Sequence, residues 1–252
     1  MAERAPRALV ITGYGINCDY ESAAACELAG FRAERVHVND VIVRGHARSS
    51  APGSLDRYQL VVFPGGFSFG DDLGSGMAFA LKVRFAKTGA GERFRDLLLA
   101  FRERGGLILG ICNGFQILAR LGLVPAVAGM FDQQVTIAPN DNWYFIDRWV
   151  RLLVEKGSPC VFTDGPAGRG GPLLRMPVRH GEGKLLPAGE EVLRAMEREG
   201  RVVLRYCDRG GEPTMAFPDN PNGSVRAIAG ICDETGRVFG LMPHPEAAVS
   251  VF

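Results

Sequence analysis

The stretch "LILGICNGFQIL", residues 107–118, decides the fold expected for this chain. Its first residues are apolar and suit a buried strand, whereas its last residues have the apolar spacing of a helix. Between them, Cys112 stands in a Gly-x-Cys-x-Gly spacing with Gly110 and Gly114. This spacing is typical of a sharp strand-to-helix turn, because small residues are needed where the chain passes close to itself. The segment therefore predicts one strand–turn–helix unit of an α/β fold.

The cysteine in this turn has two interpretations. At a nucleophile elbow, the free N–H groups and positive end of the following helix favour a thiolate and stabilise an oxyanion, with the Asn113 N–H as the natural donor. The alternative is a core cysteine whose glycine neighbours serve packing alone, since free cysteine is among the most buried residue types. The stretch by itself leaves both open.

Strands and helices alternate from this segment back towards the N-terminus. The expected elements are, in order, a strand at 7–15, a helix at 19–31, strands at 34–40 and 58–66, and helices at 76–86 and 92–106. Such alternation indicates a parallel sheet with helices on both faces, and ligands of these sheets bind at the carboxyl ends of the strands. We expect three strand ends, "GYGINCD", "PGGFSFGDD" and "GICNG", to converge at one edge.

The second half of the chain carries strand-like runs with few helices between them. Examples are "QQVTIAP", "WVRLLVEK", "LRMPVRHGEG", "VVLRYCD" and "RVFGLMPHPE". They predict an antiparallel extension, and the glycine and proline content of residues 165–172 predicts a surface loop. Because no linker separates the halves, we expect residues 1–252 to form a single domain with a β-rich insertion.

Composition and charge limit the classes of function. A net charge of +1 does not favour bulk binding to nucleic acid or anionic membrane, and no apolar stretch is long enough to span a bilayer. No signal-peptide core follows the N-terminus. The six cysteines are widely spaced without a CxxC pair, which indicates reduced thiols in the cytoplasm. The dispersed histidines show no metal-ligand spacing, so we expect no metal site.

A thiol nucleophile needs a base, and the base needs a group that orients it. His244, in "LMPHPE", directly follows a strand-like run, and the prolines on both sides stiffen its backbone. Glu246 lies two residues on, so both side chains can point to the same side of an extended segment. The chain order Cys112, His244, Glu246 agrees with a triad, although a lone histidine is commonly an ordinary structural residue.

Gly65 and Gly66, which end the run expected as a strand at 58–66, offer consecutive N–H groups for a second oxyanion donor. The alternative interpretation is a glycine turn that merely begins a helix.

Together these segments resemble the class I (triad) glutamine amidotransferases, in which a G-x-C-x-G-x-Q elbow, a Gly-Gly turn and an H-P-E segment act together. "GICNGFQ" matches the elbow through Gln116. "GINCDYE", "PGGFSFGDDLGSG", "VRHGEGKL", "NPNGSVRAIAGI" and "GLMPHPE" resemble the family of glutaminase subunits of phosphoribosylformylglycinamidine synthases. The resemblance runs over about residues 8 to 246. It implies a flavodoxin-like three-layer sandwich with a mostly parallel central sheet and a β-rich antiparallel extension.

The resemblance implies a role for each matched residue. Cys112 would attack the side-chain amide of glutamine, His244 would take the thiol proton and pass it to the departing ammonia, and Glu246 would orient His244. Gly66 and Asn113 would supply the oxyanion N–H groups.

Gly65 would belong to the same glycine turn as Gly66, and Gln116 would help to hold the glutamine. The matched motif "RHGEG" carries no duty for His180 that the residues themselves indicate. A role in shaping the site or an interface is open for His180, and Cys18 lies in a family motif near the expected interface.

The resemblance also implies partners. Ammonia would pass to a separate synthetase subunit, which uses ATP and Mg²⁺ to amidate formylglycinamide ribonucleotide in de novo purine biosynthesis, and a small third subunit usually completes such complexes. This chain has no Walker A match, so we expect no cofactor in it. The family often has arginine where this chain has Ala247, which bears on docking to the synthetase.

Two alternatives remain. One is a class I glutaminase subunit that serves a different ammonia acceptor. The other is a non-catalytic sensor on the same fold, for which His244 and Glu246 would be dispensable.

Overall fold

The computed structural model describes residues 5–44, 54–164 and 173–249, so the loop expected at 165–172 lies outside the described residues. The chain divides into two compact units, residues 1–117 and residues 118–252. The expectation of a single domain over residues 1–252 stays a prediction. Within the described ranges, no helix has the length and apolar character that crossing a bilayer requires.

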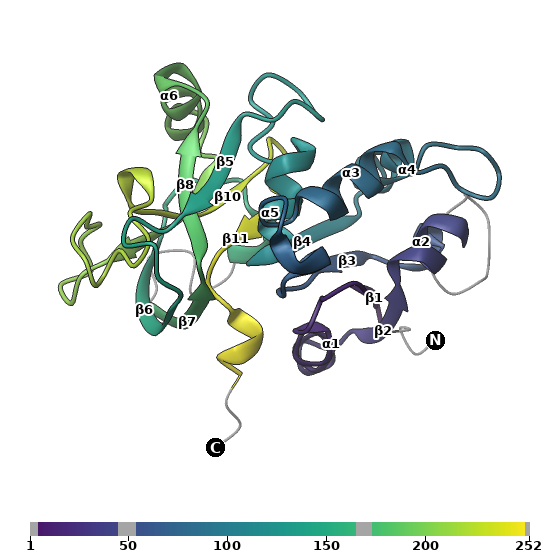
Figure 1. The fold of residues 1–252 in the computed structure, drawn as a ribbon, viewed down its shortest axis with the longest axis horizontal. Coiled ribbons are helices and arrows are strands. Elements are labelled where there is room, and N and C mark those ends of the chain that lie inside the picture. Colours follow the sequence, from purple (N-terminus) through teal and green to yellow (C-terminus); the bar gives the residue numbers. More distant parts are fainter. Residues whose placement is uncertain (1–4, 45–53, 165–172, 250–252) are drawn as a thin grey trace. The chain divides into compact units, whose positions relative to one another are not determined.

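The first unit is built on four parallel strands in the order β2-β1-β3-β4 (Figure 1). Their bounds are β1 Arg7–Thr12, β2 Arg32–His37, β3 Leu60–Phe63 and β4 Leu107–Ile111. All four residues of β3 are buried, as expected for a strand in a parallel sheet that is covered on both faces.

Five helices follow or connect these strands: α1 Asp19–Leu28, α2 Val38–Arg44, α3 Met77–Phe85, α4 Phe94–Glu103 and α5 Asn113–Leu121. Helix α4 shows why they pack on the sheet. Its buried residues Phe94, Leu98 and Phe101 recur at helical spacing, so one apolar stripe faces the core and packs against α3 and β4.

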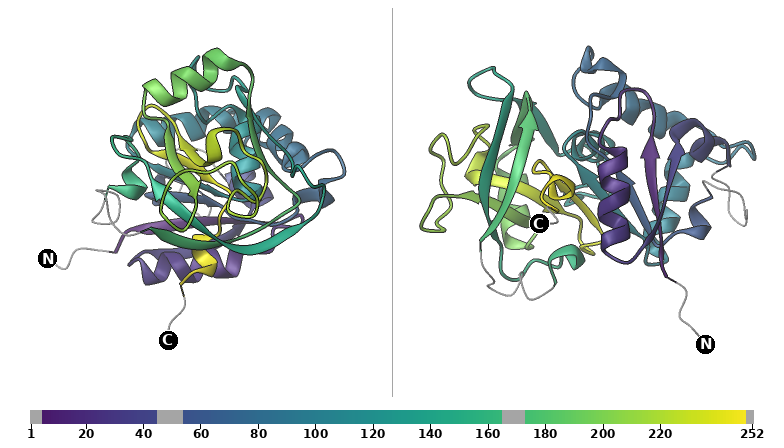
Figure 2. Two further views of the ribbon diagram at one scale, coloured as in Figure 1. Left: turned by 90° about the vertical axis from the view of Figure 1, so that its left-hand side faces the viewer. Right: turned by 90° about the horizontal axis from the view of Figure 1, so that it is seen from below.

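The second unit is dominated by antiparallel strands (Figure 2). In the order β11-β10-β9-β6-β7, neighbouring strands are hydrogen-bonded and antiparallel, and β5 pairs separately with β8. The bounds are β5 Val135–Pro139, β6 Ile146–Val154, β7 Leu174–His180, β8 Glu182–Pro187, α6 Glu190–Arg198, β9 Val202–Cys207, β10 Ile228–Cys232 and β11 Val238–Leu241.

The predicted α/β class, with parallel strands first and antiparallel strands later, is confirmed. Two elements were wrong or missed. Residues 38–40, predicted as part of a strand, begin helix α2, in which Val38, Val41 and Ile42 are buried at helical spacing. Their β-branched side chains favour strands and conceal that spacing. Helix α6 was missed, although two glutamates in its first turn indicate a helix start.

Large aromatic side chains are exposed at the start of β6. Trp143 and Trp149 are 82% and 52% exposed, and Tyr144 and Phe145 between them are exposed as well. This run of the chain is called the aromatic segment below, residues 143–149.

Candidate active site

Cys112 occupies the turn between strand β4 and helix α5. Its φ of 51° lies in the left-handed region, which is uncommon for a residue with a side chain and frequent at functional sites. The first helical hydrogen bond runs from the Gln116 N–H to the Cys112 carbonyl, at 3.1 Å. The N–H groups of Asn113 and Gly114 therefore lie in the first turn of α5, where backbone donors have no partner within the helix. This geometry is that of a nucleophile elbow.

The glycine after the elbow is required by close packing against strand β3. A Cβ atom added to Gly114 would lie 1.8 Å from the carbonyl oxygen of Phe63. The helix that follows Cys112 can therefore approach the sheet only with glycine at this position.

The Gly65–Gly66 turn follows β3 and is held by the segment after β1. The carbonyl oxygen of Gly65 accepts hydrogen bonds from the N–H groups of Asn17 and Cys18, at 3.3 and 3.2 Å. Gly66 has a φ of 148°, and a Cβ there would lie 2.6 Å from the carbonyl oxygen of Gly15. The motif "GINCD" thus clamps the glycine turn through its backbone.

The N–H of Gly66 points out of this clamp. The bonds from Asn17 N to Gly65 O and from Phe67 N to Gly15 O flank the bridge between Ile16 and Gly66. Ile16 and Gly66 therefore form a pair of the non-hydrogen-bonded kind, in which each N–H faces away from the partner strand. The Gly66 N–H is oriented away from Ile16, as an oxyanion donor requires.

Gln116 lies one helical turn after Asn113, and the two side chains are joined. Asn113 Nδ2 donates to Gln116 Oε1 at 2.9 Å, and both residues are buried. The family resemblance implies that Gln116 helps to hold the glutamine, and this role stays a prediction. In this structure its amide oxygen accepts from the elbow asparagine.

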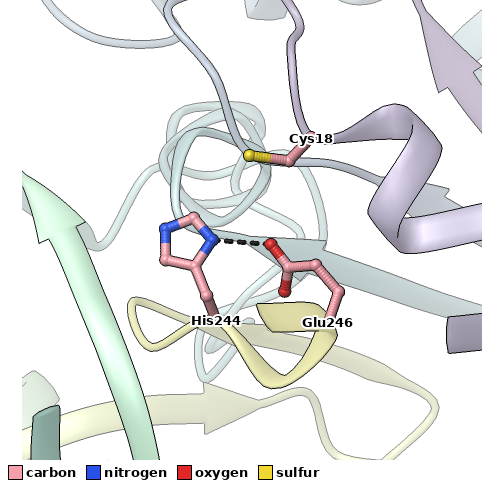
Figure 3. Close-up of side chains that lie close together, drawn as sticks. All are labelled: Cys18, His244 and Glu246. Atoms are coloured by element: carbon pink, nitrogen blue, oxygen red, sulfur yellow. Dashed lines mark hydrogen bonds and ion pairs between the residues drawn. The ribbon is translucent and has the colours of Figure 1, made fainter. Parts of the chain in front are cut away.

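His244 and Glu246 lie together in the second unit (Figure 3). His244 Nδ1 is 2.6 Å from Glu246 Oε1, and both side chains are buried. With an ionised Glu246, Nδ1–H donates and Nε2 keeps its lone pair, which is the tautomer a general base needs. The segment is a 3₁₀ turn, Pro245–Ala247, and not the extended backbone expected. The His244 N–H also donates to the Pro177 carbonyl of β7, at 2.8 Å.

The candidate residues thus form two groups. Cys112, Gly65, Gly66, Asn113 and Gln116 belong to the first unit, and His244 and Glu246 belong to the second. Over the described residues, neither unit by itself gathers three histidine, cysteine, aspartate or glutamate ligands within metal-binding reach of one another.

A buried polar network in the second unit explains the motifs "RHGEG" and "NPNGS". The Asn140 amide donates to the carbonyl oxygens of Tyr144 and His180, both at 2.9 Å. These bonds orient the amide so that its Oδ1 accepts from Gly183 N and faces His180 Nδ1, each at 3.1 Å. His180 Nδ1 is therefore the protonated nitrogen.

The other side of the His180 ring faces Asn222. The Asn222 Oδ1 accepts from Ser224 N at 3.0 Å, so its Nδ2 is the atom that lies 3.5 Å from His180 Nε2. A donor thus meets the unprotonated nitrogen. Burial, together with charge on His244, lowers the pKa of His180 to about 3. His180 is consequently a neutral cross-link between β7 and the "NPNGS" loop.

The family described as "CobB/CobQ-like glutamine amidotransferase domain" matches residues 5–252. That match covers nearly the whole chain. It agrees with the left-handed backbone conformation of Cys112 at a strand-to-helix elbow. The chain therefore belongs to the glutamine amidotransferases.

Individual relatives narrow this class. The chain is 40% identical, over 99% of its own length and 85% of the relative's, to "Phosphoribosylformylglycinamidine synthase subunit PurQ" of Methanococcus maripaludis strain S2. It is 42% identical to the protein of the same name from Dehalococcoides mccartyi, over 96% of this chain and 86% of that one.

Two solved structures resemble the chain. "Structure of PurLQS from Thermotoga maritima" contains a chain of 34% identity with a TM-score of 0.68, covering 98% of this chain and 90% of that one. A glutamine amidotransferase from the same organism has 18% identity and a TM-score of 0.51, covering 97% and 78%, which shows a shared fold.

Proposed function

We propose that this chain is the glutaminase subunit of a phosphoribosylformylglycinamidine synthase. The observation that carries the proposal is Cys112, which has a left-handed backbone conformation at the elbow and is followed by N–H groups without an acceptor within the helix. Relatives named as that subunit match the chain over nearly its whole length. In this role the chain hydrolyses glutamine to glutamate and delivers ammonia for the ATP-dependent amidation of formylglycinamide ribonucleotide in purine biosynthesis.

The reaction divides into two steps. His244 Nε2 takes the thiol proton of Cys112, and the thiolate adds to the side-chain amide carbon of glutamine. The tetrahedral intermediate expels ammonia, which takes a proton from His244, and leaves a glutamyl thioester. Water, activated by His244, then adds to the thioester, and its collapse releases glutamate and returns the thiol.

The remaining site residues support these steps by orienting the base or by stabilising negative charge. Glu246 holds the Nδ1–H of His244, so Nε2 keeps the lone pair that takes the proton. The negative oxygen of each tetrahedral intermediate accepts from the N–H groups of Gly66 and Asn113. Gln116 acts through Asn113, with which it shares a hydrogen bond.

The partners we propose are a synthetase subunit and a small third subunit, by analogy with the PurLQS assembly. ATP and Mg²⁺ are assigned to the synthetase, so the proposed chemistry of this chain needs its own side chains and water alone. A cytoplasmic location is part of the same proposal, because purine synthesis supplies nucleotides there.

The test is labelling with a glutamine-mimicking diazoketone, read by intact mass and peptide mapping, with and without the synthetase and its ribonucleotide substrate. We expect one adduct on Cys112, faster in the complex, and none in Cys112→Ala. Cys160→Ala, at a buried cysteine outside the elbow, is the matched control and should label as the native chain does. Absence of an adduct in every condition would favour the sensor alternative.

A further inference from the structure

The loop after the Gly65–Gly66 turn has an unusual backbone. Phe69, Gly70 and Asp71 have consecutive φ values of 57°, 77° and 58°, all in the left-handed region. Two of the three residues carry side chains that disfavour this region, so surrounding contacts must hold the loop in place.

The carboxylate of Asp71 supplies such contacts. Its Oδ2 accepts from Ser75 Oγ at 3.1 Å, and its Oδ1 accepts from Gly76 N at 3.4 Å. The same Oδ1 accepts from Asn113 Nδ2 at 3.4 Å, so the carboxylate joins both the end of the loop and the elbow helix.

The Asn113 side chain completes the connection to the glycine turn. Its Oδ1 accepts from the Ser68 N–H at 3.3 Å, and Ser68 is two residues after Gly66. Because Oδ1 accepts from Ser68 and Nδ2 donates to Asp71 and Gln116, the orientation of the amide is determined on both sides. One buried amide thus links the segments that carry the two proposed oxyanion donors.

We infer that Asp71 is a positioning residue for the oxyanion hole: by orienting the Asn113 amide, it sets the separation between the N–H groups of Gly66 and Asn113. The inference rests on the proposed function and deepens it. Oxyanion stabilisation depends on donors within 2.7–3.1 Å of the developing negative oxygen, and loss of one donor costs roughly 100- to 1000-fold in rate. A donor that is displaced and not removed costs less.

Asp71→Ala in the complex with the synthetase is the direct test. We expect kcat for glutamine hydrolysis to fall by roughly tenfold or more with little change in KM, because the interaction is made in the transition state. Alkylation of Cys112 by iodoacetamide should keep its rate, since the thiolate displaces iodide and no oxyanion forms. Asp71→Asn, which keeps an acceptor oxygen, should restore most of the rate.

Asp72→Ala is the matched control, because this neighbouring aspartate is exposed and makes no hydrogen bond to Asn113 among the described contacts. An unchanged kcat in Asp71→Ala would overturn the inference. Equal losses in hydrolysis and in alkylation would also overturn it, since the carboxylate would then support the elbow as a whole. A native complex that never hydrolyses glutamine would overturn the proposed function, and the inference with it.

An exchange variant tests the contact by a second route. Asn113→Asp places two carboxylates opposite each other and removes the Nδ2 donor, so hydrolysis should fall steeply. Adding Asp71→Asn returns a donor, and the double variant should hydrolyse glutamine faster than Asn113→Asp does. Additive losses would contradict a direct contact between positions 71 and 113.

Discussion

Gly114 lies so close to strand β3 that no side chain fits between them. The atom that a Cβ would meet is the Phe63 carbonyl oxygen, which is backbone and cannot move aside without displacing the strand. The spacing of the elbow motif is thus a steric requirement at its second glycine. Its first glycine, Gly110, is a buried residue of strand β4.

Gly114→Ala should therefore destabilise the protein by roughly 3 kcal/mol, the upper part of the range for overpacking. Chemical denaturation with the native chain alongside measures this loss. Gly181→Ala is the control, because a Cβ there meets no atom within 4 Å, and its free energy of unfolding should change by less than about 0.5 kcal/mol. Similar stabilities for the two variants would contradict the crowding seen at Gly114.

The sequence was sufficient to predict the turn around Cys112. It was not sufficient to predict which side chains contact one another. The glycines around Cys112 predict a turn, because tight turns need small residues. Asp71 stands in a quoted motif, yet its bond to Asn113 joins residues 42 positions apart, and no local pattern indicates it. The same holds for Asn140 and His180, which are 40 positions apart.

Among elements, strand β7 connects the buried network to His244. The ring of His180 is near its end, and the carbonyl of Pro177, three residues earlier, accepts from the His244 backbone. A cross-link that fixes the strand therefore also fixes the backbone of the proposed base. This arrangement gives "RHGEG" and "NPNGS" a structural role that the sequence did not reveal.

The neutral state of His180 predicts a pH dependence of stability. Its pKa falls from an ordinary value of 6.5 to about 3 in the folded chain. Above pH 6.5 both states are neutral, and between pH 6.5 and 3 the unfolded chain alone binds the proton. Stability is therefore lost as the pH falls, and His180 should account for about 2 kcal/mol of the loss between pH 7 and pH 5.

His180→Gln keeps one donor and one acceptor but cannot titrate, so its loss of stability over this interval should be smaller by that amount. Denaturant titrations at pH 7 and pH 5 measure both proteins. Parallel losses would show that His180 titrates normally when folded.

Secondary structure was predictable where one period dominates. Strands β1, β3 and β4 are mostly apolar runs with a glycine within three residues after their ends, and helix α4 has a clean apolar stripe. Helix α2 was misread because β-branched residues occupy its buried positions, and propensity opposes periodicity there. Helix α6 was predictable from its own pattern, because its buried Leu193 and Met196 are three residues apart among charged residues and two glutamates occupy its first turn.

For the molecule as a whole, the order of parallel strands first and antiparallel strands second was predictable from the changing pattern along the chain.

The proposed activity needs Cys112 from the first unit and His244 from the second. Glutamine hydrolysis without an acceptor wastes glutamine, so we expect the isolated chain to be slow.

Adding the synthetase and its ribonucleotide should raise the rate of glutamate release at least about tenfold, equivalent to about 1.4 kcal/mol of the barrier. A coupled glutamate assay on the isolated chain and on the complex measures the ratio. Serum albumin in place of the synthetase is the control for non-specific effects. A high rate from the isolated chain would contradict this dependence.

The aromatic segment gives the chain a built-in optical reporter. The chain has two tryptophans, and both lie in residues 143–149 with more than half of their surface exposed. Intrinsic fluorescence of the folded chain should already resemble that of indole in water, so denaturation will shift its emission little. If the emission maximum instead moves to shorter wavelength on mixing with another protein, the tryptophans of this segment have become shielded from solvent. No attached dye is needed.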